Sequence, residues 1–200
     1  NNVIEIHSWT EVPEEKLGMT EDEEMYRTAV SHLHLKYWTA YENVLKEIKI
    51  CDPACGSGAF LNQCFDYLHE EMNFVLEMKR LYNEGQLTLF DIDREILQNN
   101  LFGVDINPES VEITKLSLWL KTAKQNQTLA SLDDNIKCGN SIVTDPEIAG
   151  KYAFNWQAEF PQVFANGGFD IIIGNPPYGA TLDQPTKKYL TEKYITTEYM

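Results

Sequence analysis

The sequence has few residues of the kinds that build metal centres, disulfide frameworks and membrane anchors. Its four cysteines form no C-x-x-C pair and its four histidines add no complementary ligand spacing, so we predict no metal site and reduced thiols. No apolar run approaches the roughly 18 residues of a membrane span, and no basic-then-apolar leader opens the chain. These absences favour a cytoplasmic protein without a membrane partner.

Positive charge is also scarce. Sixteen lysines and arginines face 31 aspartates and glutamates, which leaves a net charge of −15. A surface this acidic repels a phosphate backbone, so residues 1–200 alone are not expected to clamp DNA. Eight carboxylates lie in residues 1–24 with Lys16 as the only basic residue, so we interpret this leading part as a solvated arm or helix surface.

The apolar content is sufficient for a globular core. Hydrophobic residues make up 43% of the chain and aromatic residues 12%, which excludes a disordered or low-complexity protein. We predict an acidic, largely helical segment over residues 1–47, because apolar residues recur at helical spacing on one face of residues 20–47. Residues 48–200 are predicted to form a second unit, an α/β core.

Short apolar strands alternate with helices in residues 48–200. This order predicts an α/β fold with a mostly parallel sheet and helices on both faces. In such a sheet ligands bind beyond the carboxyl ends of the strands, and the unusual short motifs of this sequence all lie there. The predicted strands are residues 48–51, 101–104, 135–138 and 169–173, and the predicted helices are residues 59–82, residues 91–98 and one that begins at Asn107-Pro108 with an apolar stripe of Ile113, Leu116, Trp119 and Leu120.

The first motif, D-P-A-C-G-S-G at residues 52–58, indicates a cofactor loop. Gly56 and Gly58 permit close backbone approach to a ligand, and the following helix points its N-terminal amides at the same place. A dinucleotide fingerprint requires a third glycine where this chain has Leu61. Asp52 also suits a cationic or amine-bearing ligand better than a pyrophosphate, so the loop favours S-adenosylmethionine over NAD.

Two later strand ends carry polar residues with two possible roles each. Asp105 could accept hydrogen bonds from both ribose hydroxyls of the cofactor while Ile106 packs against its adenine, but an aspartate here is more often an N-cap or turn former. Asn140 could read the adenine edge, but Gly139-Asn140-Ser141 is also an ordinary turn sequence. The residues alone leave both alternatives open.

The motif N-P-P-Y at residues 175–178 follows the last apolar strand. Its prolines have no N–H groups, so the carboxamide oxygen of Asn175 and the carbonyl of Pro176 could each accept one hydrogen of an exocyclic amine. Tyr178 offers a face on which an extruded base could stack. The alternative is a polyproline turn with a packed tyrosine, which the preceding apolar strand and the D-P-A-C-G-S-G loop disfavour.

Together these motifs resemble motifs I to IV of amino-group DNA methyltransferases, in that order. The sequence is most similar to the adenine-specific methyltransferase region of type IIG restriction-modification enzymes, and related phage-defence methyltransferases carry much the same motifs. The resemblance covers about residues 45–182. It implies a Rossmann-like S-adenosylmethionine-dependent methyltransferase fold and transfer of a methyl group to the N6 amine of adenine in DNA.

The resemblance also implies roles for individual residues. The first loop and the start of the next helix would bind the methionine part of the cofactor. The second strand end would bind its ribose, and the second and third strand ends would contact its adenine. The implied cofactor residues are Asp52, Pro53, Ala54, Cys55, Gly56, Gly58, Phe60, Asp105, Ile106, Asn140 and Ser141, and the implied catalytic residues are Asn175, Pro176, Pro177 and Tyr178.

The chain departs from the family pattern in two ways. Nothing upstream reproduces the aromatic-Thr-Pro signature of the family, since Trp9-Thr10 is not followed by proline. The chain also ends about twenty residues after Tyr178, so we expect the later strands and a DNA-recognition domain outside it and expect the fragment alone to be inactive. Two alternative functions are methylation of a protein glutamine side-chain amide and a catalytically silent S-adenosylmethionine-binding module.

Overall fold

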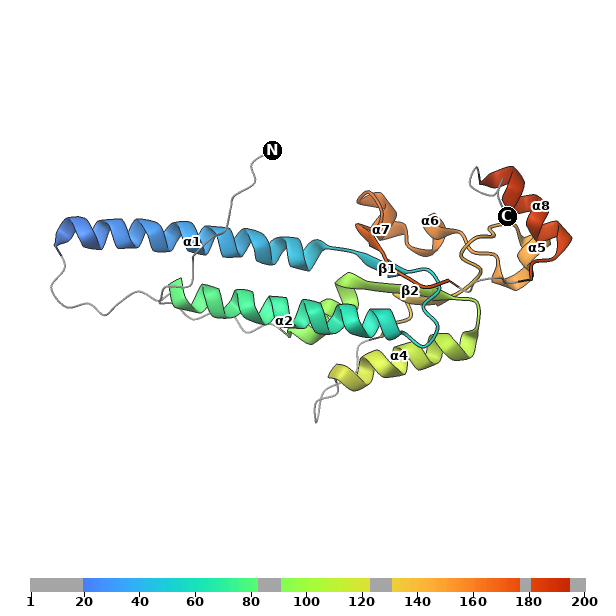
Figure 1. Cartoon of the computed structure of the whole chain (residues 1–200), viewed down its shortest axis with the longest axis horizontal. Coiled ribbons are helices and arrows are strands. Elements are labelled where there is room, and N and C mark those ends of the chain that lie inside the picture. Colours follow the sequence, from blue (N-terminus) through green and yellow to red (C-terminus); the bar gives the residue numbers. More distant parts are fainter. Residues whose placement is uncertain (1–19, 83–90, 123–130, 177–180, 195–200) are drawn as a thin grey trace.

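The computed structural model describes residues 20–82, 91–122, 131–176 and 181–194 of the chain (Figure 1). The predicted acidic segment therefore lies partly outside the described residues, together with Trp9-Thr10. In chain order the elements are α1 (Glu21–Glu47), β1 (Ile50–Asp52), α2 (Ala59–Tyr82), α3 (Ile92–Glu95), the π-helical turn η1 (Ile96–Asn100), β2 (Leu101–Asp105), α4 (Pro108–Thr122), β3 (Ile136–Cys138), α5 (Pro146–Ala149), the 3₁₀ turn η2 (Gly150–Tyr152), α6 (Trp156–Glu159), α7 (Pro161–Ala165), β4 (Ile171–Ile172) and α8 (Gln184–Lys193).

The described strands form one parallel sheet in the order β3-β2-β1-β4. The sheet confirms the predicted parallel α/β fold. Ile50 of β1 pairs with Leu101 on one side and with Ile171 on the other. Because the chain reverses its strand order between β1 and β4, the loops after these two strands meet at the point where open α/β sheets bind their ligands.

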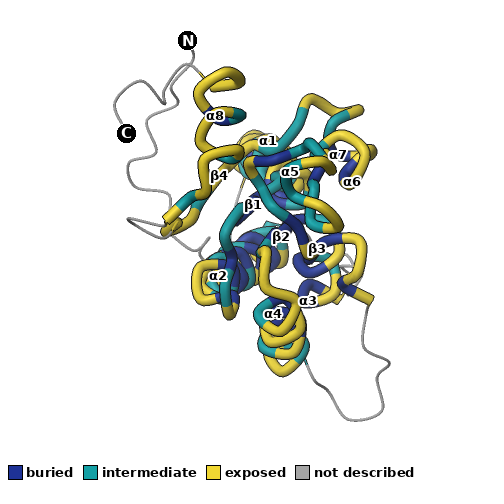
Figure 2. Tube along the Cα trace, turned by 90° about the vertical axis from the view of Figure 1, so that its right-hand side faces the viewer, coloured by how far each residue is buried: buried dark blue, intermediate teal, exposed yellow. Residues whose placement is uncertain are grey.

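Alternate side chains of the strands enter two separate cores. Ile50 and Leu101 face the core beneath α1, α2 and α4, whereas Cys51 and Phe102 face an aromatic cluster that includes Phe160. The segment that carries α6 and α7 supplies this second layer. Helices therefore lie on both faces of the sheet, as predicted, and Figure 2 shows buried β1 and β2 between them.

The ends of α1 are defined by side-chain caps. Thr20 and Glu23 form a capping box, in which the Glu23 carboxylate accepts the Thr20 N–H at 2.8 Å. At the other end, Nδ2 of buried Asn100 donates to the carbonyls of Leu45 and Ile48, both at 2.8 Å. These bonds satisfy carbonyls that the helix itself cannot pair, and they join α1 to the sheet.

Helices α1 and α2 run side by side, and α1 projects past the end of α2 (Figure 1). The rings of His34 and Tyr82 stack at 4.3 Å, while Trp38 and Leu45 continue the same line of contact toward the sheet. The helical spacing in residues 20–47 predicts one apolar face made of Met25, Val30, Leu33, Tyr37, Tyr41, Val44 and Ile48. This face is not buried throughout, because Met25, Leu33 and Val44 are more than half exposed. One neighbouring helix covers only a narrow strip of a long helix, so most of its apolar positions stay outside that strip.

The predicted stripe on α4 is wrong at three of its four positions, while Trp119 packs against the core as predicted. Ile113, Leu116 and Leu120 are more than half exposed, and the buried positions include Val111 and Thr114. Thr114 faces the sheet because α4 lies against the glycine loop, where the close approach suits a small side chain. The buried face of α4 therefore combines the apolar residues Val111 and Leu118 with Thr114, which contacts the glycine loop.

None of the helices in the four described ranges is both long and apolar enough to cross a membrane. The division of the chain near residue 47 stays a prediction. Trp38 and Leu45 share one core with Leu61 and Leu68 of α2.

Candidate active site

The loop after β1 begins with a buried acid. Asp52 is only 1% exposed, and its Oδ1 atom accepts a hydrogen bond of 3.0 Å from the backbone N–H of Ala54. Burial raises the pKa of the Asp52 carboxyl, and although the Ala54 N–H opposes this shift, the Asp105 carboxylate adds to it. A cationic group beside Asp52 would be bound favourably, because it would stabilise the ionised acid.

Two glycines shape the middle of this loop. Gly56 and Gly58 have φ angles of +52° and +83°, a region that side chains disfavour. A Cβ on Gly58 would lie 2.9 Å from Cγ2 of Thr114, and the Thr114 hydroxyl donates to the Gly56 carbonyl at 2.8 Å. A Cβ on Gly56 would meet no described atom within 4 Å. Thr114 therefore holds the loop from one side, and Gly56 borders open space in which a ligand could lie.

Asp105 joins the first loop to the second strand end. Its Oδ2 atom accepts the Gly56 N–H at 2.8 Å, and its Oδ1 atom accepts the Asn107 N–H at 2.8 Å. The second bond is the turn-forming role that the sequence left open. Each carboxylate oxygen can accept more than one hydrogen bond, so both ribose hydroxyls of a cofactor could still be bound. The turn role and the proposed cofactor role are therefore compatible.

Two exposed apolar side chains lie on the same loops. Phe60 stands in the first turn of α2 and is 39% exposed, while Ile106 follows β2 and is 52% exposed. Exposed apolar side chains at the carboxyl edge of a parallel sheet are suited to packing on the flat part of a nucleotide. The structure places these residues at the edge where the sequence predicted them.

The third strand end is tied to the first loop. The Ser141 hydroxyl donates to the Pro53 carbonyl, and Nε1 of Trp156 donates to the Ser141 carbonyl at 2.9 Å. Asn140 forms the turn that the sequence allowed, since its side-chain oxygen accepts the Ile142 N–H at 3.2 Å. Ser141 thus positions the loop, and its predicted contact with the cofactor stays a proposal.

The loop after β4 lies against the buried acid of the first loop. A Cβ on Gly174 would lie 2.8 Å from Oδ1 of Asp52 and 3.5 Å from Cδ of Pro53. Only glycine permits this approach without displacement. Asn175 and Pro176 follow and are exposed, whereas Pro177 and Tyr178 lie outside the described residues.

The structure also identifies three residues that the sequence reasoning did not assign to the site. Thr114 holds the glycine loop, Gly174 admits the Asn175 segment, and Trp156 supports Ser141. Gly174 could have been found from its place directly before the N-P-P-Y motif. Thr114 carries no sequence signal, because its role depends on how α4 packs.

A parallel α/β sheet with a glycine loop, an acidic second strand end and an Asn-Pro segment at its switch point is a methyltransferase fold. The chain belongs to the Eco57I restriction-modification methylase family, whose model matches residues 99–200. This result confirms the family resemblance and the fold class predicted from the motifs.

Three relatives illustrate the similarity. The type II restriction enzyme and methyltransferase RM.Eco57I of Escherichia coli is 29% identical over 71% of this chain and 16% of its own length. A putative type II restriction enzyme and methyltransferase, RM.MjaORFECS2P of Methanocaldococcus jannaschii, is 35% identical over 52% of this chain and 9% of its own. The adenine-specific methyltransferase PglX of Streptomyces coelicolor is 27% identical over 74% and 14%. The chain thus spans less than a fifth of each.

Proposed function

We propose that this chain is the catalytic region of an enzyme that transfers a methyl group from S-adenosylmethionine to the N6 amine of adenine in DNA, within a restriction-modification or phage-defence system. The observation that carries the proposal is the contact between Gly174 and Asp52, because it brings the Asn175 segment against the glycine loop. Membership of the Eco57I family and the similarity to a type II restriction enzyme and methyltransferase and to an adenine-specific methyltransferase support it.

The residues present suit S-adenosylmethionine. Asp52 offers a buried negative charge for the cationic methionine part, and the positive φ angles of Gly56 and Gly58 allow close backbone approach. Asp105 offers acceptor oxygens for the ribose, and exposed Ile106 offers an apolar surface for the adenine. When bound, the cofactor supplies an electrophilic methyl group on sulfur.

The Asn175 segment supplies acceptors for the target amine. The side-chain oxygen of Asn175 and the carbonyl of Pro176 would each accept one N–H of the exocyclic amine, which draws the nitrogen lone pair out of conjugation with the ring. The lone pair forms the new bond to the methyl carbon while the carbon–sulfur bond breaks. The methylated amine carries a positive charge and releases its proton to solvent, so no strong protein base is needed.

DNA contacts are proposed to come mainly from residues outside 1–200. The net charge of −15 makes these residues poor at displacing counterions from a duplex. Stacking of the extruded base on Tyr178 stays a proposal from the sequence, since Tyr178 is outside the described residues.

The test is Asn175→Ala in the full-length protein. Methyl transfer to an adenine-containing duplex, followed with tritiated S-adenosylmethionine, should fall by roughly two or more orders of magnitude, because a hydrogen bond made in the transition state is lost. Cofactor affinity should stay nearly unchanged. Asn73→Ala on the exposed surface of α2 is the matched control and should keep normal turnover.

Other outcomes separate the alternatives. Near-normal turnover by Asn175→Ala would mean that the segment is a structural proline turn, and the amine-polarising mechanism would be wrong. Methyl transfer to glutamine peptides in place of duplex would favour the protein-methylating alternative. Cofactor binding without transfer to either substrate would favour a silent binding module.

A further inference from the structure

Helix α8 and its C-cap residue Tyr194 are hydrogen-bonded to one short segment, residues 142–144, which follows the Asn140 turn. The Tyr189 hydroxyl accepts the Thr144 N–H at 3.2 Å and shares a hydrogen bond of 2.7 Å with the Thr144 hydroxyl. Lys193 Nζ donates to both hydroxyls at 2.6 Å. The Tyr194 hydroxyl donates to the Ile142 carbonyl at 3.1 Å. We call the group of Thr144, Tyr189 and Lys193 the α8 pin.

Residues 142–144, which the pin holds, directly follow Asn140 and Ser141 in the chain. Two backbone hydrogen bonds also hold residues 140–144: the Asn140 N–H donates to the Tyr152 carbonyl at 2.7 Å, and the Phe154 N–H donates to the Val143 carbonyl at 3.0 Å. Ser141 continues to the Pro53 carbonyl of the glycine loop. A hydrogen-bonded path therefore leads from α8 through this segment to the first cofactor loop.

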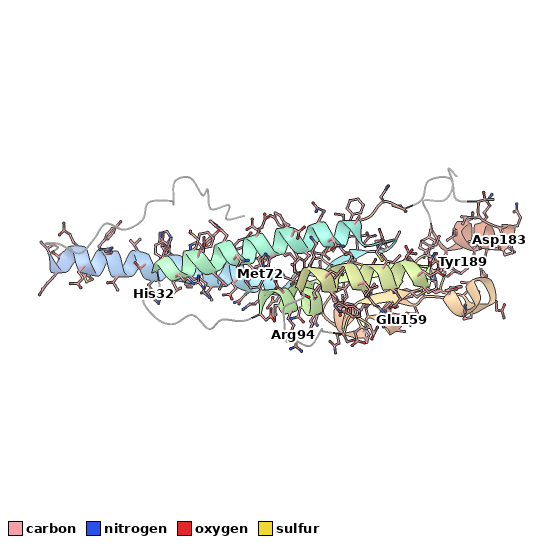
Figure 3. The ribbon with its side chains drawn as sticks, turned by 90° about the horizontal axis from the view of Figure 1, so that it is seen from below. His32, Met72, Arg94, Glu159, Asp183 and Tyr189 are labelled. Atoms are coloured by element: carbon pink, nitrogen blue, oxygen red, sulfur yellow. The ribbon has the colours of Figure 1, made fainter. Side chains whose placement is uncertain are left out.

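Helix α8 also lies close in sequence to the proposed base-binding segment. Its N-cap, Asp183, comes eight residues after Asn175, so the helix directly follows the proposed base-binding segment. Asp183 and Tyr189 lie at the end of the molecule opposite His32 (Figure 3), and the carboxyl ends of the parallel strands point the same way (Figure 1). Leu190 is the only buried residue of α8, so polar contacts provide much of its attachment.

We propose that Tyr189 and Lys193 are positioning residues, which act through Thr144 to hold the Asn140–Ser141 turn in place for the cofactor adenine. The inference rests on the proposed S-adenosylmethionine site. It goes beyond that site because neither residue lies in the four motifs that define the site. Through these residues, the helix that follows the proposed base-binding segment would support the proposed cofactor-binding turn, which links the two binding sites.

Binding of S-adenosylmethionine to the 200-residue chain, measured by calorimetry, tests the inference. Tyr189→Phe and Lys193→Met should each weaken binding by roughly three- to tenfold, the effect of losing one or two net hydrogen bonds. Lys188→Met is the matched control, since Lys188 lies on the same helix, is 78% exposed and pairs with Glu192 at 3.9 Å. Its affinity should equal that of the unsubstituted chain.

A double substitution distinguishes positioning from general destabilisation. If the pin acts through Asn140, Tyr189→Phe should weaken binding no further when Asn140 is already alanine. Amide hydrogen exchange without cofactor provides a second measurement. The Thr144 N–H should exchange faster in Tyr189→Phe, while the amides in the buried half of α2 should keep their protection.

Each remaining outcome overturns a defined part of the inference. Normal affinity in both pin variants, together with weakened binding by Asp105→Ala, would refute the positioning role and leave the proposed function standing. Additive losses in the double variant would show that the pin does not act through Asn140. Failure of the unsubstituted chain to bind cofactor would refute the proposed cofactor site and this inference with it.

Discussion

Strands β1 and β4 are hydrogen-bonded neighbours with apolar sequences, yet they differ in burial. In β1, Ile50 is 5% exposed and Cys51 is fully buried, whereas Ile171 and Ile172 of β4 are 42% and 61% exposed. Strand β1 has a neighbour on each side and helices above it, while β4 ends the sheet within the described residues. Hydropathy alone therefore does not report how well a strand is covered.

The loops that follow these strands differ in the same way. The loop after β1 is held by Asp105, by Thr114 and by Ser141, which come from three other parts of the chain. In the segment after β4, Asn175 and Pro176 are exposed. The proposed cofactor loop is therefore held in place by the buried part of the sheet, while the proposed base-binding segment lies at the edge of the described sheet.

The largest expected effect is on stability and comes from replacing one isoleucine by alanine in each of the two strands. Ile50→Ala should lower the free energy of unfolding by about 2–5 kcal/mol, because it leaves a cavity in the core. Ile172→Ala should lower it by less than about 1 kcal/mol, because the side chain is already largely in solvent. Chemical denaturation of the 200-residue chain measures both. Equal losses would show that the β4 edge is covered in solution and would remove the contrast.

The next largest effect is on cofactor binding and tests whether the loops after β1 and β2 form the proposed cofactor site. Asp105→Ala should weaken S-adenosylmethionine binding to the 200-residue chain by about 1.5–3 kcal/mol, since it removes hydrogen bonds to a charged group. Asp66→Ala is the control, because Asp66 pairs with Lys121 on the surface of α2 and α4. Calorimetry with the cofactor or its demethylated product measures the change. Unchanged affinity in Asp105→Ala would remove Asp105 from the site.

The smallest effect concerns pH and the buried acid of the first loop. Burial raises the pKa of Asp52, so the free protein holds this proton to a higher pH than an exposed aspartate does. A bound cation favours the ionised acid, so binding releases the proton. The affinity for S-adenosylmethionine should therefore rise as pH increases through the raised pKa and then level off.

Asp52→Asn separates this effect from other titrations. The variant should bind more weakly at neutral pH, and its affinity should change less with pH than that of the unsubstituted chain. Calorimetry at several pH values measures the slope. An identical slope in the variant would mean that another group is responsible and that the cofactor cation lies away from Asp52.

The features of the site that could be predicted are those that depend only on residues close together in the sequence. Positive φ angles at Gly56 and Gly58 and a polar strand end at Asp105 follow from short-range rules, and the structure shows all three. Thr114 and Gly174 act through contacts between segments about 60 and 120 residues apart. No local pattern indicates Thr114, and the place of Gly174 before the N-P-P-Y motif does not show that it lies against Asp52. The roles of the predicted residues in binding and catalysis stay predictions.

Local sequence patterns predict the four strands and the long helices α1, α2 and α4, but they do not predict the short helices α5, α6 and α7. Helices α1 and α2 cover almost the same residues as the helical pattern over residues 20–47 and the helix predicted over residues 59–82, because helical periodicity acts within a few residues. The alternation of strands and helices also determined the parallel sheet, since parallel strands need crossover connections.

Which surfaces are buried depends on the tertiary structure. Thr114 of α4 lies inside while Leu116 is exposed, and Ile172 is exposed while Cys51 is buried. The physical reason is that burial depends on which segments lie alongside each face and how closely their backbones approach. Thr114 contacts the glycine loop so closely that Gly58 has no room for a Cβ, and neither this contact nor the neighbours of a strand can be deduced from hydropathy.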